Sequence, residues 1–266
     1  MPHMMIFGLG YTSTRLAARL RAIGWRVNGT RRVADGEATA FDDRKTVLDL
    51  IADATHILSS VPPDGNRDPV LKTYGAALAQ APAIWTGYLS STGVYGDTGG
   101  AWVDESAPIG GGRRNARAEA DMTWQALRKD VRIFRLPGIY GPGRSVLDRL
   151  RSGKAHRIEM RDQVFSRVHV DDIVSGILAG LHGPSGLYNL TDDLPASQND
   201  VIEHGCSLLN IAPPPLMTLE QAALLPPARA FYSENRRVAN GKAKRVLQWK
   251  PQYQSYKQGL ASLIRE

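Results

Sequence analysis

The amino-acid sequence predicts an α/β fold, a doubly wound parallel sheet with a small, helix-rich C-terminal lobe. Two observations lead to this prediction. Short apolar runs alternate with helix-like segments through the first two-thirds of the 266 residues, which is typical of a parallel sheet covered on both faces. After "YGPGR" the alternation weakens, and the final third reads as helices joined by loops.

The first elements are a strand, a glycine turn and a helix. The strand "MMIFGLG" ends in the turn, and the following helix places Leu16, Leu20 and Ile23 on one face before Gly24 ends it. Apolar runs predict further strands at 25–32, 54–63, 83–92, 131–141 and 186–193. Helical periodicity predicts helices at 71–81 and 115–130, and residues 166–181 read as a strand followed by a helix. Ser197 and Asp200 resemble a capping box that opens one more helix.

Composition narrows the class of protein. Apolar content of 42% and charged content of 22% are ordinary for a soluble globular protein. The single cysteine, Cys206, permits no internal disulfide, and no apolar run is long enough to span a bilayer. The N-terminus also lacks the basic and long apolar regions of a signal peptide. We therefore expect a cytoplasmic protein that is not inserted in a membrane.

The net charge of +7 points to an anionic partner. Basic residues are scattered among acidic ones, and no run of five or more Lys and Arg occurs. The interleaved aromatic and basic residues of an RNA-binding sheet are also missing from the sequence. An anionic small molecule is therefore a better expectation than nucleic acid.

The turn "GLGYTS" has the composition of a dinucleotide-binding turn. Gly8 permits the tight turn, Gly10 lets the backbone approach a pyrophosphate, and Ser13 takes the third glycine position because it is small. Tyr11 and Thr12 lead into the helix expected from Ser13, whose free N–H groups attract phosphate. The alternative is a purely structural turn, but its place between a strand and a helix favours cofactor binding.

The end of the second strand indicates which dinucleotide is bound. An acidic residue there would hold the ribose 2′-hydroxyl of NAD, whereas the chain has Arg31 and Arg32 in "GTRR". Arginine suits a 2′-phosphate through charge-assisted contacts. NADP is therefore favoured over NAD, with a solvated charged turn as the alternative.

Six segments in order resemble the extended short-chain dehydrogenase/reductase family, in its nucleotide-sugar epimerase and dehydratase group. They are "GLGYTS", "LSSVPP", "SSTGVYG", "RLPGIYGPGR", "RVHVDDIVSGI" and "NRRVANGKAKRVLQWKPQY". The resemblance implies a Rossmann-type domain at 1–145, completed by about 166–195, and a substrate lobe at 146–165 and 196–266. It also implies bound NADP or NAD near Val61 and Pro62, and a substrate such as a sugar nucleotide. A homodimer is compatible with it.

The resemblance also implies a catalytic triad, which this chain carries only in part. The family uses a Ser or Thr to hold the substrate oxygen, and Ser91 and Thr92 match that position. A Tyr and a Lys four residues later move the proton, because the Lys lowers the Tyr pKa. At the positions of that pair, counted back from Glu119, the chain has Gly111 and Asn115.

Other residues can be considered as replacements for the missing pair. Tyr95 and Tyr140 are candidate proton donors, although tyrosines in such strands usually pack in the core. Asn115 is able to hydrogen-bond the cofactor ribose without carrying charge. Positive charge is available from three nearby arginines, which are Arg113, Arg114 and Arg117.

The remaining polar clusters are expected to have structural or surface roles. His169 with Asp171 and Asp172 is expected to anchor the start of a helix. Asp104–Glu105 is expected at the surface. Three arginines in the polar segment, either solvated or facing a substrate, are Arg144, Arg149 and Arg151.

Two functions from different classes remain open. The first is an atypical NADP-dependent reductase, epimerase or dehydratase, favoured by Ser91, Thr92 and the full C-terminal lobe. The second is a non-catalytic NAD(P)-binding sensor or interaction protein, favoured by the absent Tyr and Lys. The sequence favours the enzyme.

Overall fold

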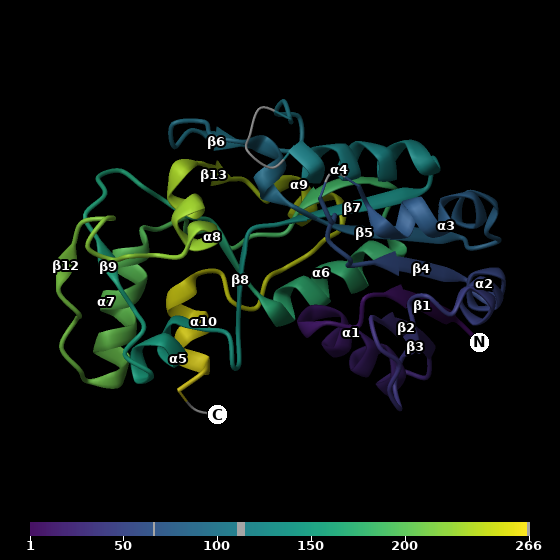
Figure 1. Cartoon of the computed structure of the whole chain (residues 1–266), viewed down its shortest axis with the longest axis horizontal. Helices are drawn as coiled ribbons and strands as arrows, with labels where there is room; N and C mark the ends of the chain where they lie inside the picture. The colour runs from purple at the N-terminus through teal and green to yellow at the C-terminus, as the bar shows by residue number, and fades with distance from the viewer. Residues whose placement is uncertain (66, 111–114, 265–266) are drawn as a thin grey trace.

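A seven-stranded, wholly parallel sheet forms the centre of the computed structural model, which describes residues 1–65, 67–110 and 115–264 (Figure 1). The strand order is β11-β7-β5-β4-β1-β2-β3. The strands are β1 (His3–Phe7), β2 (Arg26–Arg31), β3 (Thr39–Ala40), β4 (His56–Ser59), β5 (Trp85–Ser91), β7 (Val131–Leu136) and β11 (Gly186–Asn189). The expected Rossmann-like α/β fold is thereby confirmed.

Helices cover both faces of the sheet. One face carries α1 (Tyr11–Ala22), α6 (Val170–His182) and α9 (Gly241–Val246), and the other carries α2 (Arg44–Asp53), α3 (Pro69–Gln80) and α4 (Asn115–Leu127). Strand β1 shows why both faces need cover. Met4 and Ile6 pack into the first layer while Met5 and Phe7 pack into the second, because successive strand side chains point to opposite faces.

The C-terminal lobe has its own apolar core. It is built by α5 (Val146–Arg151), α7 (Gln198–Leu209) and α10 (Tyr256–Ser262), which gather beyond one end of the sheet (Figure 1). The remaining short elements are β6 (Trp102–Val103), β8 (Gly138–Tyr140), β9 (Arg157–Ile158), β10 (Arg167–His169), β12 (Leu216–Met217), β13 (Arg237–Val238), α8 (Pro226–Arg229) and two 3₁₀ turns, η1 (Thr92–Tyr95) and η2 (Ala230–Ser233). The parallel pair β8–β10 leads the chain from the sheet into the lobe and back.

Three details differ from the expectations. The strand expected at 131–141 is two strands, β7 and β8, interrupted at Pro137, which has no N–H to donate to a ladder. Helix α2 was not anticipated. Helix α9 lies within the expected lobe range, yet Ala243 packs in the core of the sheet together with α1 and α6.

The capping box that opens α7 is confirmed. The Ser197 hydroxyl accepts from the Asp200 N–H at 3.0 Å, and the Asp200 carboxylate accepts from the Ser197 N–H at 3.2 Å. Within the described residues, no helix is both long enough and apolar enough to cross a membrane.

Candidate functional site

A cavity of about 900 Å³ lies where the carboxyl ends of β4, β5 and β7 meet the C-terminal lobe. Strands β1 and β4 are neighbours, and the helices that follow them, α1 and α3, cover opposite faces of the sheet. This reversal creates the crevice in which open α/β sheets bind ligands.

The glycine turn is shaped by contact with the end of β4. Gly8 has φ +85°, and a methyl group added there would lie 2.9 Å from Val61 Cγ2 and 3.0 Å from Ser60 Oγ. Ser60 Oγ donates to the Gly8 carbonyl at 2.6 Å and accepts from Ser13 Oγ at 2.8 Å. Ser13 therefore does more than fill a small position, because it ties α1 to the end of β4.

The N-terminus of α1 opens into the cavity. Gly10 is its N-cap with no side-chain cap, and a Cβ built there would meet no atom within 4 Å. Tyr11, Thr12 and Ser13 line the cavity beside it. Uncapped N–H groups and open space above Gly10 are what a phosphate requires at a helix start.

Of the other residues expected to contact the cofactor, some line the cavity and others lie beside it. Pro62 lines the cavity, whereas Val61 packs behind the turn against Gly8. Arg31 lies at the end of β2, where Nε donates to the Leu9 carbonyl at 3.0 Å and the guanidinium pairs with Asp35.

Arg32 follows β2 and is exposed. Asp35 is already occupied, because Oδ1 accepts from the N–H groups of Glu37 and Ala38, each at 2.9 Å. These backbone bonds and Arg31 lower the pKa of Asp35. Asp35, the acid that follows β2, therefore stabilises the loop in which it lies.

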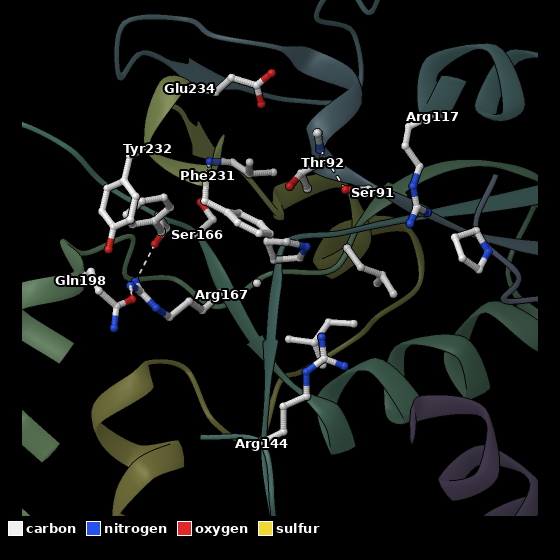
Figure 2. A pocket seen from close by; sticks show the side chains of 18 of the residues that line it. Ser91, Thr92, Arg117, Arg144, Ser166, Arg167, Gln198, Phe231, Tyr232 and Glu234 are labelled. Atoms are coloured by element: carbon white, nitrogen blue, oxygen red, sulfur yellow. Dashed lines mark hydrogen bonds between the residues drawn. The ribbon is translucent and has the colours of Figure 1, made fainter. Parts of the chain in front are cut away.

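Ser91 and Thr92 lie together at the end of β5 and both line the cavity (Figure 2). Ser91 Oγ accepts from the Gly93 N–H at 3.1 Å and caps η1. The hydroxyl proton of Ser91 is therefore free of that bond, and both hydroxyl-bearing residues lie at the cavity wall.

Neither candidate proton donor, Tyr95 or Tyr140, lines the cavity. Tyr95 is buried away from the cavity, where its hydroxyl donates to Asn189 Oδ1 at 2.8 Å and accepts from Arg135 Nη1 at 3.1 Å. Tyr140 packs its hydroxyl against Gly259 in the lobe core. Burial raises the pKa of both phenols, and neither lines the cavity.

Helix α4 presents Arg117 to the cavity instead of Asn115. Asn115 is exposed at the first position of α4 and is not among the lining residues, whereas Arg117 is. The sequence positions Gly111, Arg113 and Arg114 lie outside the described residues.

The lobe side of the cavity is strongly basic. Of the three arginines in the polar segment, Arg144 and Arg149 line the cavity and Arg151 does not. Figure 2 shows Arg167, Gln198 and Tyr232 on the side opposite Ser91 and Thr92. The described lining residues that carry or can carry positive charge are Arg117, Arg144, Arg149, Lys154, His156, Arg167 and Arg236.

Sequence reasoning missed several of these residues. Arg167 lies on β10 at the start of the segment "RVHVDDIVSGI", which predicted no substrate contact, and Tyr232 lies on η2 outside every quoted segment. Glu234 is the single acid among the described lining residues, and its carboxylate pairs with Arg236 at 3.0 Å.

Two acidic clusters have structural roles. His169 caps α6 as expected, since Nδ1 accepts from the Asp171 N–H at 3.3 Å, and Asp172 accepts from the backbone of Gln252 and Tyr253. The expectation that Glu105 lies at the surface is wrong: it is 9% exposed, and burial raises its pKa.

No group of three or more His, Cys, Asp and Glu that could hold a metal ion occurs in the part of the chain that the structure describes. No family model matches the chain.

The fold and cavity define a Rossmann-like α/β protein with a ligand-sized cavity at the carboxyl ends of its strands. MoeE5, solved with UDP-glucuronic acid and NAD, is 18% identical with a TM-score of 0.80, over 99% of this chain and 98% of that one. The human epimerase family protein SDR39U1, solved with NADPH, is 16% identical with a TM-score of 0.78, over 99% of each chain.

A nearer relative shows the family. A functionally unknown conserved protein from Silicibacter pomeroyi is 38% identical, with a TM-score of 0.90 over 99% of this chain and 98% of that one. This chain belongs to the same family as that protein. A 3-diazoavenalumate denitrifying reductase from Streptomyces is 28% identical over 259 residues, which are 92% of this chain and 80% of the reductase.

Proposed function

We propose that this protein is an NADP-binding enzyme of the extended reductase, epimerase and dehydratase type that acts on an anionic small molecule. The observation that carries the proposal is the continuity of the cavity. One space joins the N-terminus of α1, the Ser91–Thr92 hydroxyls and the basic face of the lobe. A cofactor and a second, anionic ligand can therefore meet at the end of β5.

The residues around α1 fit a dinucleotide. Gly8, Gly10 and the first-turn residues Tyr11, Thr12 and Ser13 would hold the pyrophosphate, because the helix start is uncapped and the space above Gly10 is open. Structural neighbours solved with NAD or NADPH support this assignment. The cofactor, when bound, supplies hydride transfer.

The preference for NADP rests on charge after β2. Arg31 is oriented by its bond to the Leu9 carbonyl, and exposed Arg32 adds a second guanidinium. Asp35 is held by its own loop and by Arg31, so its carboxylate is committed before a ribose arrives. Glu37, the other acid of this loop, pairs with Arg31 at 3.6 Å, so a 2′-hydroxyl finds both acids paired, whereas a 2′-phosphate gains the exposed Arg32 and competes with these acids for Arg31.

Proton transfer follows a non-standard route. Ser91 and Thr92 hold and polarise the substrate oxygen, and Arg117 supplies positive charge on the α4 side. Tyr95 and Tyr140 are buried elsewhere, the Tyr11 hydroxyl donates to the Pro142 carbonyl, and Tyr232 lies on the side opposite Ser91. We therefore assign the proton to solvent or to an acidic group of the substrate. A sugar nucleotide fits the anionic requirement, as does a smaller acid.

Titration calorimetry with NADPH and NADH tests the proposal. We expect NADPH to bind more tightly, by about tenfold or more, because each charge-assisted contact to the phosphate contributes roughly 1.5–3 kcal/mol. Equal affinities would remove the role of Arg31 and Arg32. No binding of either cofactor would overturn the proposed function.

A second candidate function is a non-catalytic NADPH sensor. It is favoured by one observation: no Tyr–Lys pair lines the cavity among the described residues. Sugar nucleotides and small keto or aromatic acids, incubated with NADPH and enzyme, distinguish the two functions. We expect slow or no oxidation of NADPH with simple sugar nucleotides and turnover with a smaller acid. Tight binding without turnover on any of them supports the sensor.

A further inference from the structure

Arg167 is a buried cation without a paired acid. It is 8% exposed, and Nη1 donates to the carbonyls of Phe165 at 2.8 Å and Ala196 at 2.9 Å, and Nη2 donates to the Ser197 carbonyl at 3.5 Å, all of them uncharged acceptors. Among the described residues, no carboxylate lies within ion-pair distance of its guanidinium. Buried charges are normally paired, because an unpaired one loses its hydration without compensation.

The nearest acid that acts on Arg167 compensates it only in part. Asp192 interacts with Arg167 electrostatically at a longer distance. Burial, however, raises the pKa of Asp192 to about 7, so part of the Asp192 population is uncharged near neutral pH. Arg167 keeps a lowered pKa, of about 10, in spite of this neighbour.

Arg149 places a second unpaired cation on the same wall. It reaches the cavity from α5 and forms no ion pair within the described part of the chain. Arg149 is exposed by surface area, although desolvation by the surrounding residues lowers its pKa. Arg149 and Arg167 are close enough to repel each other, and both act on the Tyr232 hydroxyl.

Gln198 adds an unused donor. Its Oε1 accepts from Arg167 Nη2 at 3.2 Å, which orients the amide, and the buried Nε2 has no hydrogen-bond partner among the described residues. Gln198 lines the same cavity. A buried N–H donor left without an acceptor costs about 1–3 kcal/mol, so this wall combines unused donors with unpaired positive charge.

We infer that Arg149, Arg167 and Gln198 form the seat for an oxyanion group, a phosphate or a carboxylate, of the molecule that reacts at Ser91 and Thr92. The inference rests on the proposed function and adds to it the place where the substrate's charge is held. Every group in the seat donates, and the single lining acid in the described residues, Glu234, is already paired with Arg236.

The space between the seat and the reacting end suits an apolar or ring-shaped body. Phe231 is 51% exposed and lies between Arg167 and Ser91 in the view of Figure 2. Phe165 and Tyr232 pack edge to face beside the seat, with ring centroids 5.6 Å apart. A ligand with its oxyanion at Arg167 can therefore lay its body over Phe231 and present its other end to Thr92.

Calorimetric titration of the NADPH-saturated protein tests the seat. Inorganic phosphate and benzoate are the probes, at constant ionic strength. We expect at least one of them to bind, with phosphate alone indicating a phosphate ester and benzoate alone a carboxylic acid. If neither binds, the seat is overturned.

Variants locate the binding. Arg149→Met and Gln198→Leu should each weaken probe binding, by about tenfold or more for the lost charge-assisted bond of Arg149. Arg151→Met is the matched control, since Arg151 lies on the same helix but outside the cavity lining. Unchanged binding in both seat variants, or an equal loss in Arg151→Met, would contradict the assignment.

The two proposals fail separately. If NADPH binds and neither anion does, the seat is wrong and the cofactor site stands. If NADPH does not bind, the proposed function fails, and the same titrations without cofactor still test the seat. Melting temperatures of the variants confirm that each one folds.

Discussion

A buried ion pair lies directly beneath the candidate site. Arg135 on β7 bonds Asp121 on α4 through Nη2 at 2.8 Å and Nε at 3.0 Å, with both side chains at most 1% exposed. Asp121 also accepts from Ser90 Oγ at 2.6 Å, and Arg135 donates to the Tyr95 hydroxyl. This network fixes the end of β5, where Ser91 must be held.

Replacing Tyr95 with Phe should lower stability without affecting the cofactor. The variant leaves Arg135 Nη1 and Asn189 Oδ1 without their shared hydroxyl, so we expect a loss of about 1–3 kcal/mol in the free energy of unfolding. Urea denaturation measures it, with Tyr253→Phe as the more exposed control. Normal stability combined with lost turnover would show that Tyr95 is the proton donor after all.

Substitutions of Arg117 and Asn115, which both lie on α4, should affect NADPH binding differently. Arg117→Ala should weaken NADPH binding by about tenfold, since it removes a cation from the cofactor end of the cavity. Asn115→Ala should leave the dissociation constant unchanged, because Asn115 does not line the cavity. Fluorescence titration of NADPH measures both, and the reverse order would restore Asn115 to the ribose site.

At the scale of elements, the region where the sheet meets the lobe buries two carboxyl groups and a histidine, Asp172, Asp192 and His169. His169 starts α6, Asp172 anchors the backbone of residues 252–253, and Asp192 follows β11. Burial lowers the pKa of His169 to about 4 and raises the pKa of Asp172 to about 6 and of Asp192 to about 7. The stability of this region therefore depends on pH.

The sign for Asp192 is set by its raised pKa. Its contribution to stability is fully present below the unfolded value of 3.8 and is lost as pH rises toward about 7. Asp192→Asn should abolish this loss. The free energy of unfolding of the variant minus that of the wild type should therefore increase with pH, by up to about 1.4 kcal/mol per pH unit across that window. Urea denaturation at several pH values measures the difference, in which the contributions of His169 and Asp172 cancel. A difference independent of pH would contradict the account.

Elements with strong periodicity were predictable, and the lobe side of the site was not. Alternating apolar runs predicted β1, β4 and β5, and local motifs predicted the glycine turn and Ser91–Thr92. Helix α2 has only two buried residues, Val47 and Ile51, so its apolar signal is weak. Arg167 and Tyr232 enter the cavity only because the lobe folds back on the sheet, which no local pattern encodes.

At the scale of the whole molecule, the cavity is lined by two parts of the fold, the central sheet with α1 and the C-terminal lobe. In the proposed function, the sheet and α1 hold a dinucleotide, and the lobe supplies positive charge for a second ligand. The net charge of +7 is therefore concentrated in part where a reaction would occur. The hydroxyls of Ser91 and Thr92 stand between the two.

The most direct test of this account is a crystal structure of the complex with NADPH. The account predicts the pyrophosphate over Gly10 at the start of α1, and the 2′-phosphate beside Arg31 and Arg32. It also predicts the nicotinamide facing Ser91 and Thr92 with the basic lobe open beside it. A cofactor bound elsewhere, or a nicotinamide directed away from these hydroxyls, would contradict the central claim.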